Sequence, residues 1–61
     1  MIKFYIQELR SNKYYNEPNF VFDIEQVKLY DSYIEAEIIV NKLIYDNKIS
    51  GMFQINKTYI N

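Results

Sequence analysis

The chemistry open to this 61-residue chain near pH 7 rests mainly on carboxylates, because the sequence contains no histidine and no cysteine. Two acidic pairs lie close together in the sequence, Asp23 with Glu25 and Glu35 with Glu37. Paired carboxylates can perform acid–base catalysis or bind Mg²⁺. Neither pair is accompanied by a glycine-rich phosphate loop or by a serine nucleophile with a base partner. We therefore predict a protein that is not an enzyme, with no cofactor and no metal site.

The length limits the chain to a single domain that spans residues 1–61. A domain of this size buries only about 60% of the surface that its unfolded chain exposes. Without a disulfide or a structural metal, its core supplies roughly 3–5 kcal/mol. The core must therefore be tightly packed or be completed by association with another chain.

The charge is unevenly distributed along the sequence, although the net charge is only −1. Residues 17–37 carry six acids and one base, and the rest of the chain carries two acids and six bases. An acidic middle argues against general binding to nucleic acid, which requires a basic surface. It is either a solvated rim or a face that meets a basic surface of a partner protein.

The sequence predicts neither a membrane span nor a secretory signal. No apolar run approaches the ~20 residues that cross a bilayer. Met1-Ile2-Lys3 leads directly into an alternating pattern, unlike a signal peptide. We therefore expect a cytoplasmic protein with no membrane partner.

Period-two alternation predicts the strands. Residues 2–9 are typical of a half-buried strand, residues 27–30 and 52–60 are predicted as further strands, and residues 13–16 can return as a short second strand. Residues 13–26 as a whole remain open between strand and loop, because a proline interrupts them.

A capping box marks the start of one helix. Ser32 is in the N-cap position and Glu35 is three residues later, which predicts a helix over about 33–47. The sequence therefore predicts an α+β fold, with a small antiparallel sheet of three to four strands and one helix packed on one face.

The predicted helix carries apolar residues on two sides. The expected core stripe consists of Ala36, Ile39, Val40, Leu43 and Ile44. Ile34, Ile38 and Tyr45 form a second stripe on nearly the opposite side. Either the Pro18–Phe22 loop folds over this second stripe, or the stripe is an exposed patch for self-association or for a partner.

Seven tyrosines are many for a chain of this length. Tyrosine is favoured at interfaces, and Tyr14-Tyr15 beside a turn would suit an anchor for a partner, although tyrosine is also a common strand residue. Single-stranded bases could stack on the strand face of Lys3, Tyr5 and Gln7, but the acidic middle of the chain argues against this use.

Two segments carry a resemblance to known proteins: residues 27–37, Val-Lys-Leu-Tyr-Asp-Ser-Tyr-Ile-Glu-Ala-Glu, and residues 51–55, Gly-Met-Phe-Gln-Ile. They are similar to small phage-encoded proteins of strand–strand–helix–strand type, in which a strand ends in Asp-Ser and an acidic-Ala motif begins the helix. The matching positions are capping and packing residues, so no functional residue is carried over. Many such phage proteins bind and block host proteins, including bacterial immune nucleases, and the resemblance implies the same role in the host cytoplasm.

These features predict a non-enzymatic phage-type accessory protein that binds and inhibits a host protein with a basic surface, such as a bacterial defence component. The alternative is a homo-oligomeric binding module, such as a homodimer, that uses the second stripe as its self-interface and holds a small nucleotide ligand between subunits. The predicted contact residues are Ile34, Ile38, Tyr45, Glu35, Glu37, Asp31, Tyr14 and Tyr15.

Overall fold

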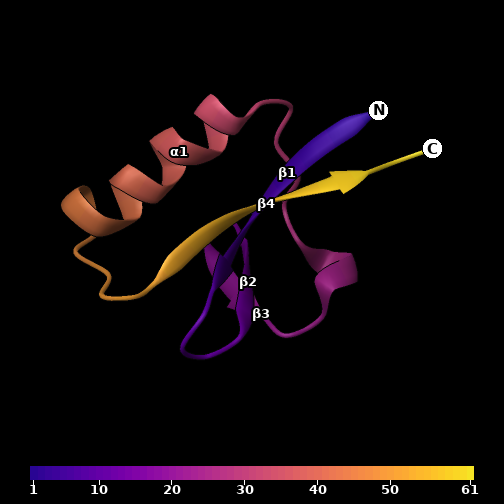
Figure 1. The fold of residues 1–61 in the computed structure, drawn as a ribbon. Helices are drawn as coiled ribbons and strands as arrows, with labels where there is room; N and C mark the ends of the chain where they lie inside the picture. Colours follow the sequence, from indigo (N-terminus) through magenta and orange to yellow (C-terminus); the bar gives the residue numbers. More distant parts are fainter.

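The computed structural model describes all 61 residues and confirms a small α+β fold. Its antiparallel sheet has the strand order β3-β2-β1-β4, and the helix covers one face (Figure 1). Two short helical turns, η1 and η2, accompany the strands and the helix α1. In chain order the elements are β1 (Ile2–Glu8), β2 (Lys13–Asn16), β3 (Asn19–Val21), η1 (Ile24–Gln26), α1 (Tyr33–Asn41), η2 (Lys42–Asp46) and β4 (Phe53–Tyr59).

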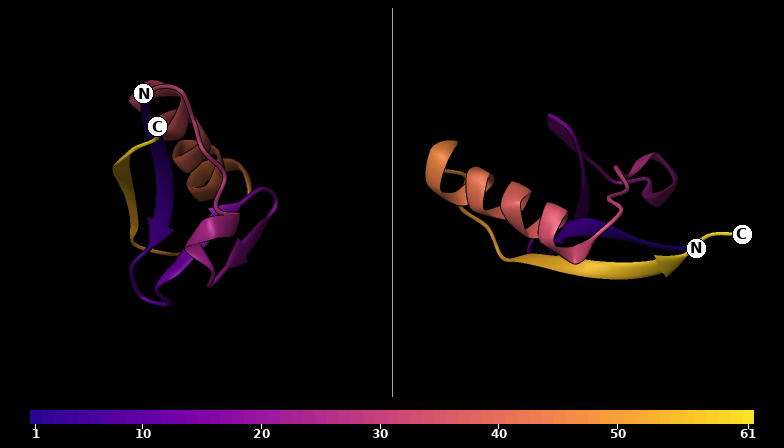
Figure 2. Two further views of the ribbon diagram at one scale, coloured as in Figure 1. Left: turned by 90° about the vertical axis from the view of Figure 1, so that its right-hand side faces the viewer. Right: turned by 90° about the horizontal axis from the view of Figure 1, so that it is seen from above.

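Strand β1 is the centre of the sheet. It pairs with β4 along its whole length, from Ile2 opposite Tyr59 to Glu8 opposite Phe53, but with β2 only at its last two residues. Strands β2 and β3 therefore turn out of the plane of β1 and β4 (Figure 2). The resulting sheet is curved, and the core lies between the sheet and α1.

The predicted strand at residues 27–30 is wrong for most of its length. Only Tyr30 pairs with the sheet, by exchanging two backbone hydrogen bonds with Phe4 of 2.9 and 2.8 Å. The Lys28 N–H instead donates to the carbonyl oxygen of Tyr15 (3.1 Å). The segment crosses from the end of β2 to the start of β1, so it meets each strand at one point rather than along a ladder.

The helix begins where the capping box predicts. The Ser32 hydroxyl oxygen accepts from the Glu35 N–H (3.1 Å), and the Glu35 carboxylate accepts from the Asp31 N–H (3.1 Å). After Asn41 the helix continues as the wider π-helical turn η2, in which the Asn47 N–H donates to the Lys42 carbonyl (2.9 Å). The helical run ends at residue 46, one residue before the predicted end.

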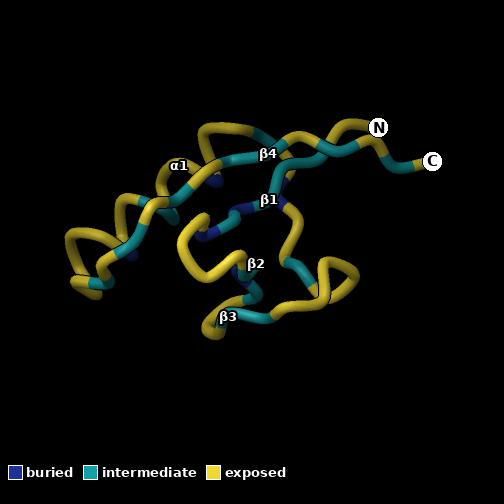
Figure 3. The backbone as a smooth tube through the Cα atoms, turned by 60° about the horizontal axis from the view of Figure 1, so that its bottom comes forward, coloured by how far each residue is buried: buried dark blue, intermediate teal, exposed yellow.

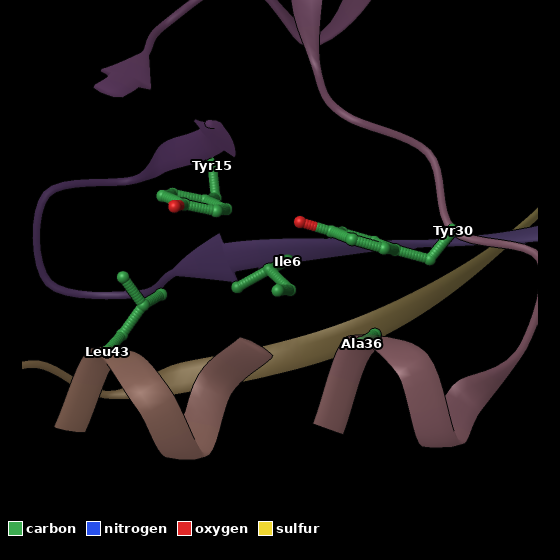
Figure 4. Packing of buried hydrophobic residues seen from close by; sticks show 5 residues of the cluster. All are labelled: Ile6, Tyr15, Tyr30, Ala36 and Leu43. Atoms are coloured by element: carbon green, nitrogen blue, oxygen red, sulfur yellow. The ribbon is translucent and has the colours of Figure 1, made fainter. Parts of the chain in front are cut away.

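The core is small and is built from both sheet and helix. Its buried apolar members are Ile6, Tyr15, Tyr30, Ala36 and Leu43 (Figure 4). Most of the chain is half-buried or exposed (Figure 3). The predicted core stripe of the helix is confirmed at four of its five positions. The exception is Ile44, which is 38% exposed and lies at the margin of the core.

Lys48 follows the helix in a left-handed backbone conformation, with a φ of 54°. This conformation costs an L-residue roughly 1–2 kcal/mol, which glycine avoids. We expect Lys48→Gly to raise the free energy of unfolding by about 0.5–1 kcal/mol, measured by urea denaturation. Asp46→Gly, inside the helical run, is the matched control and should lower it. A loss of stability in Lys48→Gly would contradict the assignment of strain to this position.

Candidate protein-interaction surface

An apolar row lies on the side of the helix that faces away from the sheet. Ile34, Ile38 and Tyr45, here called the outer row, are 66%, 50% and 72% exposed. The alternative that the Pro18–Phe22 loop covers them is wrong, because Asn19–Val21 form β3 and pair with β2. The outer row is therefore free for contact with another molecule.

The acidic residues near the outer row differ in how far they are already engaged. Asp31 forms an ion pair with Lys3, whose hydrogen bond and charge hold the pKa of the Asp31 carboxyl below its usual value. The Glu35 carboxylate is held by the capping box. Glu37 is exposed and has no ion-pair partner in the chain. Of these three predicted contact residues, only Glu37 is fully available to a partner.

The two adjacent tyrosines point to opposite faces of the sheet, as neighbouring strand residues must. Tyr14 lies on the uncovered face, with its ring 5.8 Å from that of Tyr5. Tyr15 is only 5% exposed and packs in the core, with its ring 5.2 Å from that of Phe20. The prediction that Tyr15 contacts a partner is therefore wrong, whereas Tyr14 remains accessible on the open face.

The uncovered face of the sheet holds a second candidate surface. A groove of about 280 Å³ lies over the middle of β1 and the end of β4, and its apolar walls are Tyr5, Ile24, Val27, Leu29 and Ile60. The polar side chains of this face are largely engaged within the chain. Lys3 pairs with Asp31, and the Gln7 side chain bonds Asn12 (2.6 Å) and Asn56 (2.9 Å). Lys3 is the only cation among Lys3, Tyr5 and Gln7, and it is paired with Asp31. This strand face therefore has no free positive charge for the phosphates of single-stranded bases that would stack on it.

Glu8 accepts more hydrogen bonds than any other side chain of the molecule, and no local pattern in the sequence marks it. Its carboxylate accepts from the N–H groups of Arg10 (3.0 Å), Ser11 (2.7 Å) and Met52 (2.9 Å), and from the Ser11 hydroxyl (2.8 Å). These bonds lower its pKa from 4.5 to about 2, the bond from Met52 having the largest effect. The nearby Gly51 leaves room for it, since a Cβ there would lie 3.1 Å from the Glu8 Cγ.

The arrangement around Glu8 resembles a reactive cluster but does not have the properties of one. Ser11 and Lys13 line a hollow of about 200 Å³ beside the carboxylate. A general base needs a pKa near the working pH, and a carboxylate with a pKa of about 2 is a weak base. Asp23 is likewise committed, because it caps η1 by accepting from the Glu25 N–H (2.9 Å). The polar groups of both clusters hold the backbone in place.

No helix of the structure combines the length and the apolar character that crossing a membrane requires. No group of three or more acidic side chains is arranged to hold a metal ion. No family model, no curated protein and no solved structure matches the chain.

Proposed function

We propose that the chain is a non-enzymatic protein-binding module that inhibits a host protein by docking through the outer row. The observation that carries the proposal is the exposure of Ile34, Ile38 and Tyr45 in one row of a single helix. A rigid helix with apolar side chains at such spacing is the usual form of helix-in-groove recognition. Leaving these side chains in water is unfavourable, and a partner's groove would remove them from it.

The charge around the outer row favours a partner with a basic rim. Glu37 is unpaired, and Glu35 is exposed at the surface although its carboxylate caps the helix. Such charges at the edge of an apolar contact act mainly on the rate of association and on the choice of partner. The proposed partner is therefore a cytoplasmic host protein with an apolar groove bordered by lysine or arginine side chains, and a bacterial defence protein is the class implied by the resemblance to small phage proteins.

Inhibition by coverage suits a chain of this size. A 61-residue domain has little room for a preorganised pocket, but an interface of standard size needs only about 800 Å² on each partner. The carboxylates Glu8 and Asp23 are occupied by backbone N–H groups, so they supply no reactive group to a substrate. A function that depends on surface contact is the one that these features support.

The test compares two variants with the same apolar-to-acid change. We expect Ile38→Asp to weaken capture of a host protein about tenfold or more, while Phe22→Asp, at an exposed position outside the helix, captures as well as the wild type. Affinity purification from a bacterial lysate followed by mass spectrometry measures the effect, and thermal unfolding checks that both variants fold. Equal capture by Ile38→Asp, or loss of its fold, would contradict a docking role for the outer row.

A further inference from the structure

The outer edge of β4 is a long, unprotected strand edge. Strand β4 contains seven residues in continuous register with β1, with no proline or glycine and with Lys57 as its only charge. The opposite edge of the sheet is β3, which has only three residues and follows Pro18. Natural proteins shorten or charge the edges that are not used for pairing. The β3 edge is shortened, whereas the β4 edge is more than twice as long and carries a single charge, Lys57.

The hydrogen-bond pattern shows which backbone groups of β4 are free. The Ile60 N–H donates to the Met1 carbonyl (2.8 Å), and the Leu9 N–H donates to the Met52 carbonyl (2.8 Å). Bonds to one neighbour alternate along an antiparallel strand, so even-numbered residues of β4 face β1. The N–H and C=O groups that point away from the sheet therefore belong to Phe53, Ile55, Lys57 and Tyr59.

We infer that two copies of this chain form a symmetric dimer through antiparallel pairing of their β4 strands, centred on Asn56. In this register each outward-facing residue meets an outward-facing residue of the second copy: Phe53 meets Tyr59, and Ile55 meets Lys57. All four free positions of both strands are then paired. The two sheets join into one, and the dimer satisfies backbone groups that are otherwise bonded only to water.

The side chains of β4 are self-complementary in this register. Phe53 lies beside Tyr59 of the second copy on the helix-covered face, and aromatic cross-strand pairs stabilise sheets. Lys57 lies opposite an isoleucine rather than opposite its own copy, so no like charges face each other. On the open face, Gln54 lies opposite Thr58 of the second copy, so each of these polar side chains has a polar neighbour.

One flank of helix α1 faces the free edge of β4. Tyr30 pairs with β1 on the side away from β4, and the Glu35 carboxylate reaches Asp31 next to it. The flank that carries Glu35 therefore faces away from β4. The opposite flank, which lies toward the free edge, carries Tyr33, Glu37, Val40 and Ile44, the spacing of a helix–helix contact.

In the dimer, the flank that carries Tyr33 on one helix faces the same flank of the helix in the second copy. Helix α1 packs on both β1 and β4. Figure 2 shows that α1 lies nearest to β4 at its N-terminal end and runs away from β4 toward its C-terminal end, so the two helices of the dimer approach each other at their N-terminal turns. Tyr33, which is exposed in the single chain, lies at that end of the helix and would be covered there.

This interface differs from the outer row, which points away from the sheet and stays exposed in the dimer. The two outer rows would lie on the same face of the joined sheet and would present two docking helices to a partner. The dimer does not depend on the proposed function, and either can fail without the other.

A single introduced cysteine tests the register, because the chain has none of its own. Asn56 would face its own copy across the two-fold axis, with Cα atoms about 4.5 Å apart, which a disulfide can bridge. Gln54→Cys and Thr58→Cys are matched controls on the same strand face, where the copies lie about 13 Å apart. Circular dichroism of each reduced variant checks its fold.

At about 100 µM we expect wild-type chain to sediment at twice its mass of 7.5 kDa. Under mild oxidation, we expect Asn56→Cys to cross-link roughly tenfold faster than either control. A monomeric wild type would overturn the inference, and so would a dimer in which all three variants cross-link at the same rate. Capture of a host protein by a monomer would retain the proposed function while rejecting the dimer.

Discussion

Replacing Leu43 by alanine is expected to leave much of the protein unfolded at 25 °C. Leu43 is only 1% exposed and is one of the two largest fully buried side chains, the other being Ile6. Truncating such a leucine costs about 2–5 kcal/mol, since it removes apolar contacts and leaves a cavity. A domain of this size has roughly 3–5 kcal/mol in total. Far-UV circular dichroism and urea denaturation measure the loss.

The control for this prediction lies on the same helix. Ile38→Ala makes a similar truncation at a side chain that is half exposed, and we expect it to change the free energy of unfolding by less than about 1 kcal/mol. Both variants are compared at one protein concentration, because association would shift apparent stability by mass action. Similar losses in the two variants would show that the helix does not have the inner and outer sides described above.

Replacing Glu8 by glutamine is the second change with a large expected effect. The carboxylate accepts four hydrogen bonds, three of them from backbone N–H groups. A glutamine side chain has one acceptor oxygen and turns an NH₂ donor toward groups that are themselves donors. We expect a fall of roughly 5–10 °C in the melting temperature, measured by thermal unfolding at pH 7. Gln54→Glu, on the exposed face of β4, is a control for the change of charge and should have little effect.

The same carboxylate predicts how stability depends on pH. Its pKa is about 2 in the folded chain and 4.5 in the absence of these bonds, so the unfolded chain takes up the proton first. The stability that Glu8 contributes is complete above about pH 4.5 and is lost as the pH falls toward 2. Unfolding measured between pH 7 and pH 2 should show a steeper acid loss in the wild type than in Glu8→Gln. Asp31, whose pKa is also lowered, is present in both and cancels in the comparison. Parallel curves would contradict the role assigned to Glu8.

Local patterns were sufficient for most of the elements and for the outer row. The capping box needs only Ser32 and Glu35, three residues apart, and it begins the helix as predicted. The two sides of the helix follow from its period of 3.6 residues, so Ile34, Ile38 and Tyr45 could be placed together before any fold was known. Alternation predicted β1 and β4 for the same reason. These features depend on residues that are close in the chain.

The features that could not be predicted depend on which distant segments of the chain pair with one another. Which of Tyr14 and Tyr15 is buried depends on the register of β2 against β1, and a shift of one residue would exchange them. Residues 27–30 alternate like a strand, but only Tyr30 finds a free position on β1. The role of Glu8 required Met52, 44 residues away, to come within hydrogen-bonding distance.

The sequence by itself determined the helix, its two apolar sides and the alternation of the strands, because these depend on short spacings and on the geometry of each element. Only the tertiary structure decided that the outer row is uncovered, that Glu8 joins two distant segments, and that β4 lies at an open edge. Each of these depends on which segment lies next to which, and that is set by the free energy of packing the whole chain around one small core.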